Sequence, residues 1–534
     1  MRSDAEPFRS RNAATVKYPR IVVKIEFEVD SIFLTSHDDI SNLPGDVILG
    51  VLQDPNATSQ KIVPDEARSE IGSFSFSLID KDSVFTDGIR TRLLDDGYGL
   101  RGKKVKLYIG YSGFVTIDGS AGYAFGAGSF GSHEFGGSAT QSEQVLDCNF
   151  ADFGLFQTQI VTGVSFDAGV YRVSCKDITR EQRSDILEPK ITNLAQPVTD
   201  SATTVEVYDS SEFQPIAHGT SYSDSPSATV GYIKIEKEII KYTAKTPSTF
   251  TGCTRGALNT KAVAHTFETT ADQDRRPKVE EYIYLEEPCA ALAYKLLTGK
   301  DPLTGLIVWP EHWHMGISTS LVRLADFTGI GTDLWDTADS TSGFVAYFTG
   351  LKKVTGKQFI ESEIYVLLGC YSPIYADGTI GLKRMNHVLA DSASLVTLNE
   401  NNCVSWSELR HEYGMLHNRI RIDWNWNGEE FTRSNLFIDN TSIALHGEAP
   451  VKTYSFKGLH GARHTDSIIR TRIDAIRDRY SQPPETMSVT VLPSLNVLEL
   501  GDIGRVNLST VRDFAAEGDN INRSFEIQQG SYNW

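Results

Sequence analysis

Apolar and polar residues alternate along much of the first third of the chain, and this alternation predicts β-strands. The sequence SFSFSL places Phe74, Phe76 and Leu78 on one face of a strand. A second alternating stretch follows at residues 100–111. Because several such strands are separated by turn residues, we expect a closed or nearly closed barrel over residues 18–190.

A different β pattern occupies residues 231–266, GYIKIEKEIIKYTAKTPSTFTGCTRGALNTKAVAHT. Two short alternating strands are followed by a segment that turns sharply at two glycines. This pattern predicts a small β insert domain at residues 191–275; a generic β-hairpin with a glycine turn is the simpler interpretation. The residues expected to define the fold of the insert are Gly252, Arg255, Gly256 and His265.

Helical signals appear after a polar linker at residues 272–277, with none expected before it. Residues 288–299 begin with proline and end with glycine, as helices commonly do. A second helix is expected at 319–328. We therefore interpret residues 276–341 as a helical or mixed region that links two β-rich parts.

Alternating patterns return toward the end of the chain. They predict strands at 361–368 and 418–426, and an isoleucine stripe predicts a helix at 465–480. Residues 342–534 are therefore expected to form a second barrel. The predicted fold class is a β-rich α+β, multidomain protein, with two tube-like barrels, a small β insert and a few helices.

Residues 110–137 form an unusual insert that is rich in glycine and contains no lysine or arginine. Such a loop cannot build a core of its own. Its aromatic side chains could instead order against a neighbouring subunit, since exposed aromatic residues in a free loop are costly. The candidate interface residues are Phe114, Tyr123, Phe125, Phe130 and Phe135. A variable hairpin tip is the alternative.

Length and net charge argue against some classes of function. The chain has 534 residues and a net charge of −18, which disfavours a dedicated DNA-binding protein because phosphate contacts require clustered basic residues. An acidic surface would keep a passing DNA from sticking, although it also simply aids solubility. No apolar run has the length of a membrane helix, so no membrane insertion is expected. Residues 1–17 are expected to form a disordered arm without a secretory signal.

The sequence offers few candidate residues for metal binding or catalysis. Six cysteines are scattered without a close pair, so buried thiols are expected, and an iron–sulfur cluster is a minor alternative. His312 and His314 form an HxH pair without an evident third ligand, and His460 and His464 precede the expected helix. The sequence contains no HExxH, GxSxG or Walker motif. We therefore expect no enzyme activity, no catalytic or metal site and no cofactor.

Several of these segments resemble tail-tip and baseplate hub proteins of tailed bacteriophages. In the insert, EIIKYT is followed by TGCTRGALNTKAVAHT; elsewhere GSFSFSLID, LRGKKVKLYIGY, NRIRIDW and LELGDIGRVNL occur in the family's order. The resemblance spans residues 18–508, with the glycine-aromatic insert and the N-terminal arm as departures.

The resemblance implies a structural role in the virion tail, after assembly in the host cytoplasm. It further implies a homotrimer that adapts a sixfold tail tube to a threefold tip and holds a central spike or fibres. DNA would pass through the lumen during genome ejection without specific binding. A receptor- or carbohydrate-binding tail module and a tail-associated peptidoglycan hydrolase remain as alternatives.

Overall fold

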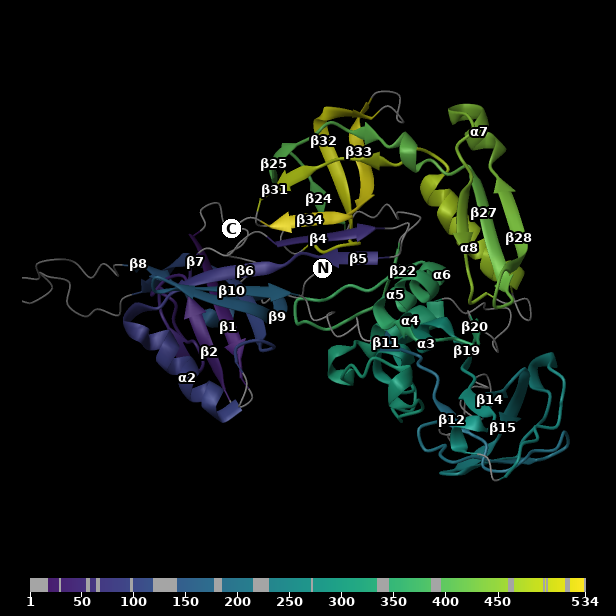
Figure 1. The fold of residues 1–534 in the computed structure, drawn as a ribbon. Coiled ribbons are helices and arrows are strands. Elements are labelled where there is room, and N and C mark those ends of the chain that lie inside the picture. Colours follow the sequence, from purple (N-terminus) through teal and green to yellow (C-terminus); the bar gives the residue numbers. More distant parts are fainter. Residues whose placement is uncertain are drawn as a thin grey trace, which may run out of the picture.

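Strands dominate the structure, a computed structural model, and helices are few (Figure 1). The predicted fold class, a β-rich α+β protein of several units, is confirmed. The structure describes residues 18–27, 30–53, 58–63, 68–96, 99–118, 142–176, 185–214, 230–269, 272–333, 345–385, 395–459, 465–492, 495, 498–513 and 519–532. The predicted arm, residues 1–17, lies outside these ranges.

The N-terminal region forms one large sheet with the strand order β3-β2-β1-β7-β9-β10-β6, and β8 pairs with β7 beyond the sheet. Its predicted alternation is observed, because Phe74, Phe76 and Leu78 are buried on one face. The strands are β1 Tyr18–Glu26, β2 Ser31–Thr35, β3 Asp46–Ile48, β6 Phe74–Ile79, β7 Lys104–Asp118, β8 Ser142–Asp147, β9 Gly154–Asp167 and β10 Val170–Lys176.

A short segment after β3 connects β2, which lies beside the edge strand β3, to the opposite edge strand β6. The amide of Leu52 donates to the carbonyl of Thr35 in β2 (3.0 Å), and the amide of Gln53 donates to the carbonyl of Ser77 in β6 (2.8 Å). These bonds link β2 to β6 and give a backbone carbonyl of each strand a partner.

Helix α2, Val84–Asp96, lies between β6 and β7 and was not predicted, because helices were expected only after residue 277. Phe85 and Ile89, one helical turn apart, are buried in the core of the sheet. The carboxylate of Asp80 accepts hydrogen bonds from the amides of Phe85 and Thr86 at the helix start. The signals available in the sequence were the acidic cap and the helical spacing of Phe85, Ile89 and Leu93. Among the described residues, neither this helix nor any other is long and apolar enough to cross a membrane.

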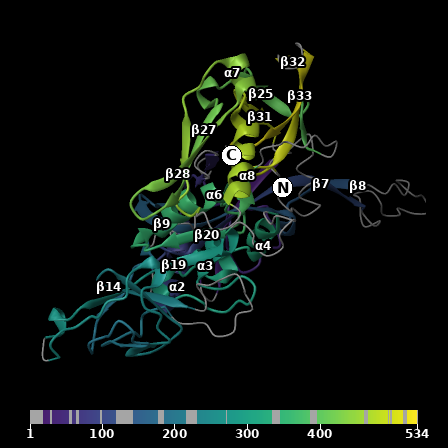
Figure 2. The same ribbon diagram turned by 90° about the vertical axis from the view of Figure 1, so that its right-hand side faces the viewer.

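The insert domain contains two small sheets that share one core, built around Ile233, Ile240 and Phe250. It projects away from the C-terminal strands (Figures 1 and 2). One sheet has the order β12-β18-β14-β15 and the other β13-β17-β16. The strands are β12 Ile191–Asn193, β13 Thr204–Glu206, β14 Gly231–Ile235, β15 Glu238–Tyr242, β16 Ala244–Thr246, β17 Thr249–Thr251 and β18 Lys278–Glu281.

The central region contains the predicted helix as α3, Cys289–Thr298, which ends at Gly299 in the left-handed conformation. The second helix, α4 Leu324–Asp333, begins later than predicted, because the carbonyl of Leu321 accepts a hydrogen bond from the amide of Ile380. The strand predicted at 361–368 is wrong: α5 Gly356–Phe359, a π-helix Ile360–Tyr365 and α6 Val366–Leu368 occupy it. Its buried side chains recur at helical spacing: Ile360, Ile364, Leu367 and Leu368.

The C-terminal region contains the predicted helix as α8, Thr465–Tyr480, with its isoleucine stripe buried. The helix packs near the sheet β28-β27-β29 (Figure 1). The elements of this part are β27 Arg419–Trp426, β28 Phe431–Ile438, α7 Asn440–His446 and β29 Lys452–Ser455.

The remaining described strands form several short sheets instead of one continuous sheet. In one of them the last strand, β34, pairs with the hairpin β4–β5 from the N-terminal region. These strands are β4 Thr58–Val63, β5 Arg68–Ile71, β11 Asp185–Ile186, β19 Tyr284–Pro288, β20 Val345–Thr349, β21 Val354–Thr355, β22 Cys370–Tyr371, β23 Lys383–Arg384, β24 Thr397–Leu398, β25 Cys403–Trp406, β26 Arg410–His411, β30 Glu485–Thr486, β31 Val489–Val491, β32 Ile503–Asp513, β33 Asp519–Glu526 and β34 Gln529–Tyr532.

Candidate functional site

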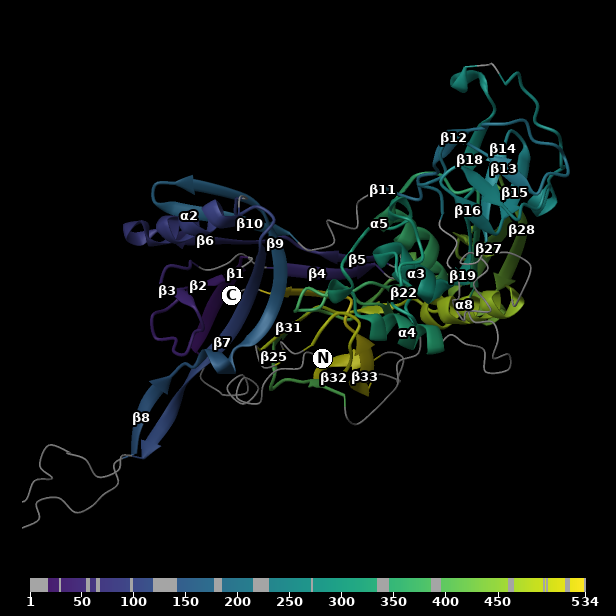
Figure 3. The ribbon, with the colours of Figure 1, turned by 90° about the horizontal axis from the view of Figure 1, so that it is seen from below.

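The predicted glycine-aromatic loop is carried by the hairpin of β7 and β8, which projects from the large sheet (Figure 3). Phe114 lies on β7, in register with Leu146 of β8. The other four candidate interface residues lie outside the described residues: Tyr123, Phe125, Phe130 and Phe135. Their interface role therefore stays a prediction.

In the insert domain, the motif residues Arg255, Gly256 and His265 meet around one buried carboxylate, that of Glu238. Arg255 donates from Nε to Oε1 (2.8 Å) and from Nη2 to Oε2 (2.6 Å). The Nε2 atom of His265 lies 2.8 Å from Oε2. The sequence indicated Arg255 and His265 but missed their common partner. The available signal was that Glu238 has the same strand parity as the buried Ile240.

The donors around Glu238 keep its carboxylate charged. Burial raises the pKa of the Glu238 carboxyl, but hydrogen bonds from Arg255, the Gly256 amide, His265 and the Val263 amide outweigh burial and lower the pKa to about 2. A buried charge with several donors acts as a cross-link within the domain. We call these residues, Glu238, Arg255, Gly256, Val263 and His265, the carboxylate network.

Steric constraints explain why glycine occupies two positions of the motif. Both adopt positive φ angles, 63° at Gly252 and 61° at Gly256. A Cβ atom on Gly256 would lie 2.8 Å from the carbonyl oxygen of Thr260, and one on Gly252 would collide with the side chain of Thr243. The motif therefore encodes a tight chain crossing beside the carboxylate network.

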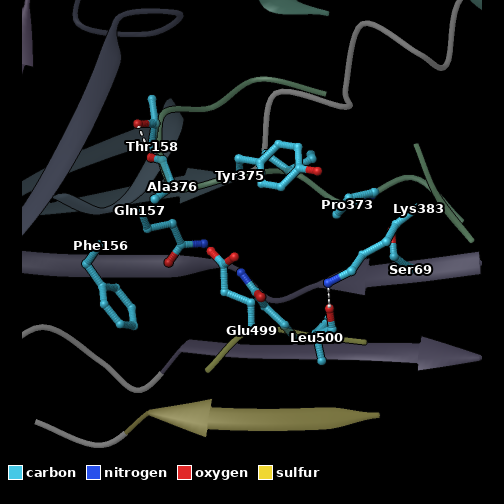
Figure 4. A pocket seen from close by; sticks show the side chains of 12 residues that line it. Ser69, Phe156, Gln157, Thr158, Pro373, Tyr375, Ala376, Lys383, Glu499 and Leu500 are labelled. Atoms are coloured by element: carbon cyan, nitrogen blue, oxygen red, sulfur yellow. Dashed lines mark hydrogen bonds between the residues drawn. The ribbon is translucent and has the colours of Figure 1, made fainter. Parts of the chain in front are cut away.

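Segments that are distant in the sequence meet between the large sheet, the central region and the C-terminal strands. Side-chain donors here bond to backbone carbonyl oxygens of other segments (Figure 4). Thr158 Oγ1 donates to Ala376 (2.7 Å), and Lys383 Nζ donates to Leu500 (3.0 Å). We call this site the junction. Its bonding side chains are Ser69, Thr158, Tyr371 and Lys383.

The junction contains a partly open pocket with a volume of about 30 Å³, lined by side chains that include Gln157, Tyr375 and Glu499 (Figure 4). Such a volume holds about one or two water molecules. Together with the pairing of β34 and β4, the junction fastens the N-terminal and C-terminal β regions to each other.

A further polar contact connects the insert domain to the central region. Glu281 in β18 is buried, and its Oε2 atom lies 2.8 Å from Nε2 of His312. The same carboxylate accepts hydrogen bonds from the amides of Lys190 and Gln214. His312, a candidate metal ligand, therefore binds a carboxylate of another domain.

The other candidate ligands do not assemble a metal site within the described residues, where no group of three or more His, Cys, Asp or Glu side chains could hold a metal. Burial lowers the pKa of His314, whose Nδ1 accepts a hydrogen bond from the Gly316 amide (3.0 Å). His460 and His464 lie outside the described residues.

The six cysteine thiols are buried and lie in five separate hydrophobic clusters. Only Cys289 and Cys370 share one, and burial raises the pKa of both thiols. The chain therefore does not bring four cysteines together, as a four-thiolate cluster needs.

No protein-family model matches the chain, and no curated protein matches it. Among solved structures, it is similar to the 43 kDa tail protein of prophage MuSo2 from Shewanella oneidensis, with 9% identity, a TM-score of 0.35, and coverage of 96% of this chain and 94% of that one. It is also similar to a tail protein from Neisseria meningitidis MC58 (9% identity, TM-score 0.34, 96% and 91% coverage). A third match is prophage tail protein gp18 from Listeria monocytogenes EGD-e (9% identity, TM-score 0.35, 96% and 90% coverage). The expected likeness to tail proteins is thus found among solved structures. Because these TM-scores are below 0.5, the function proposed next rests on the chain's own residues.

Proposed function

We propose that this chain is a structural, non-enzymatic protein of a phage-like tail, located in the virion and acting as its tail-tip or baseplate hub. The observation that carries the proposal is the fastening of the two β regions by β4–β34 pairing and the junction. A hub must keep two tube-like units of one chain in fixed relation, and these long-range bonds supply that rigidity. The order of sequence motifs supports the same role.

In this role the chain forms a homotrimer that closes the tail tube and presents six similar faces to it. The central spike or fibres are bound on the opposite side, and DNA passes through the lumen without specific contacts. The projecting β7–β8 hairpin supplies the contact to a neighbouring subunit or to the tube.

The test combines solution mass with negative-stain electron microscopy of the full chain, alone and with a tail-tube protein. Threefold rings with a central lumen are expected. Replacing residues 119–141 with a short Gly-Ser turn, which keeps β7 and β8, should weaken ring formation or tube binding. Replacing residues 215–229 of the insert domain is the matched control. A monomer that stays single and unbound in the presence of tube protein would contradict the hub role.

One observation favours a receptor- or carbohydrate-binding role instead. A groove with a cavity volume of about 380 Å³ is lined by polar side chains such as Gln358 and Lys457 and by apolar ones such as Leu351, Phe359 and Trp426. Within it, Oε2 of Glu363 is buried with no hydrogen-bond partner among the described residues, and burial raises the pKa of this carboxyl. Binding on a glycan array that Glu363→Gln abolishes would support this role over the hub.

A further inference from the structure

Three ionisable side chains meet inside the central region, at the end of α3. Glu287 lies in β19, Lys295 lies in α3, and Asp301 lies in the loop that follows α3. Their exposed fractions are 0%, 2% and 2%, so all three are shielded from water. Nζ of Lys295 lies 3.0 Å from Oε2 of Glu287 and 3.5 Å from Oδ2 of Asp301. We call these three residues the buried triad.

The backbone fixes Asp301 relative to α3. The amide of Asp301 donates to the carbonyl of Leu306, and the amide of Gly305 donates to the carbonyl of Asp301, both at 2.9 Å. The amide of Val308 donates to the carbonyl of Gly299, the left-handed residue that ends α3 (3.0 Å). The amine of Lys295 and the carboxyl group of Asp301 are therefore already held together, which removes most of the entropic cost of a reaction between them.

The two oxygens of the Asp301 carboxyl group have different surroundings. Oδ1 accepts hydrogen bonds from the amides of Leu303 (3.0 Å) and Thr304 (2.9 Å) and from the hydroxyl of Thr304 (3.1 Å). Oδ2 instead faces Nζ of Lys295. Three donors on one oxygen stabilise negative charge there, as the donors of an oxyanion hole do in acyl transfer. The carboxyl group is thus arranged as an acyl group that the amine can attack.

Burial favours an uncharged product over the ion pair. An ammonium and a carboxylate that are shielded from water each lose solvation, and their mutual attraction offsets this loss only in part. An amide carries no net charge and avoids that cost. We infer that Lys295 and Asp301 form a covalent amide bond between Nζ and Cγ, with Glu287 as the group that accepts and returns a proton. The ion pair in the structure is the arrangement before this reaction.

The reaction requires only the groups of the buried triad. Glu287 accepts one proton from Nζ and passes it to Oδ2, which leaves a neutral amine and a neutral carboxyl group. Nζ then attacks Cγ, and negative charge develops on Oδ1 beside its three donors. The Cγ–Oδ2 bond breaks, and Oδ2 leaves as water with a second proton from Nζ. The amide keeps the third proton, and Glu287 is unchanged. The chain modifies itself once and turns over no substrate.

An exposed site of the same composition provides a matched control. Nζ of Lys353 lies 3.2 Å from Oδ2 of Asp185 and 3.8 Å from Oε2 of Glu188. These three side chains are about half exposed, so water solvates their charges and the ion pair should stay unreacted. If proximity alone were sufficient, both sites would be linked; if burial is required, only the buried triad is linked.

Mass spectrometry of the purified full chain tests the inference. The intact wild-type chain should be lighter than its sequence by one water molecule. Trypsin does not cleave after an acylated lysine, so peptide 279–300 should be found joined to peptide 301–323. Cleavage after Lys353 should proceed normally. A wild-type chain with the full mass of its sequence would overturn the inference without the need for any variant.

Variants assign the bond to the triad. Lys295→Arg and Glu287→Gln should keep the full masses of their sequences, whereas Lys353→Arg should lose one water molecule like the wild type. Circular dichroism checks that each variant is folded. A loss of water that persists in Lys295→Arg would contradict the inference, since an aspartate can also lose water to its own backbone. Equal linkage in Glu287→Gln would show that the assigned role of Glu287 is wrong. These masses are measured on the isolated chain, so the result is independent of the hub proposal.

Discussion

The carboxylate network and the junction both hold chain segments together, but they do so by different means. In the network, one fully buried charge collects its donors from residues 255–265, close to it in sequence. In the junction, hydroxyl and ammonium donors bond to carbonyl oxygens more than 100 residues away, and Lys383 also forms an ion pair with Asp502 (3.0 Å). The network therefore stabilises one small domain, whereas the junction fixes domains relative to each other.

The insert domain and the junction should respond differently when their polar contacts are removed. Breaking a buried ion pair leaves a charge without compensation, which costs far more than one neutral hydrogen bond. The insert domain should thus lose its fold as a unit when its carboxylate is removed. The junction should loosen gradually, because each of its bonds contributes separately.

The largest effect is expected for Glu238→Gln. Arg255 then keeps its buried charge without a counter-charge, and we expect a loss of about 3–5 kcal/mol in the stability of the insert domain. Hydrogen exchange of amides in β14 and β15 measures this local stability. The exposed Glu268→Gln in the same domain is the control and should change it by less than about 0.5 kcal/mol. Equal exchange in the two variants would refute the role of the network.

Acid should produce a related effect, because the Glu238 carboxyl has a pKa of about 2 in the folded protein and an ordinary value of about 4.3 when unfolded. A lowered folded pKa contributes stability that is present above about pH 4.3 and is lost as the pH falls toward 2. The loss should be about 3 kcal/mol. Other carboxyls titrate in the same window, so the quantity to measure is the difference between wild type and Glu238→Gln. That difference should shrink from pH 6 to pH 2; a constant difference would contradict the low pKa.

The same contrast explains which parts the sequence could predict. The insert motif was recognisable because Gly252, Arg255, Gly256 and His265 bond or pack within their own segment. The pairing of β34 with β4 could not be foreseen, since it joins residues near opposite ends of the chain. Periodicity located α3 and α8 correctly but failed at 361–368, where a short apolar run was taken for a strand although Ile364, Leu367 and Leu368 follow a helical spacing.

A smaller effect is expected when the junction is overfilled. Gly501 has a φ of 71°, and a Cβ atom there would collide with the hydroxyl of Tyr371, which donates to the carbonyl of Leu500. Gly501→Ala should therefore lower the free energy of unfolding by about 2 kcal/mol, which is measured as a fall in the melting temperature. Gly414→Ala, where nothing lies near the added atom, is the control. Adding Tyr371→Phe removes the colliding hydroxyl, so the double variant should be less destabilised than the sum of its singles. Strict additivity would show that the collision does not occur.

The smallest effect tests whether a single junction bond contributes at all. Thr158→Val keeps the side-chain shape but removes the hydrogen bond to Ala376, and we expect a loss of about 1 kcal/mol. Thr162→Val on the same strand removes a more exposed bond to Ser174, where water can replace the lost donor, so its effect should be smaller.

Limited proteolysis between residues 373 and 383, relative to cleavage of the insert domain, separates local loosening from unfolding. Faster cleavage there in Thr158→Val alone is expected, because the insert domain keeps its own carboxylate network. Equal cleavage in both variants would mean that backbone pairing of β34 with β4, and not side-chain bonds, holds the two β regions together.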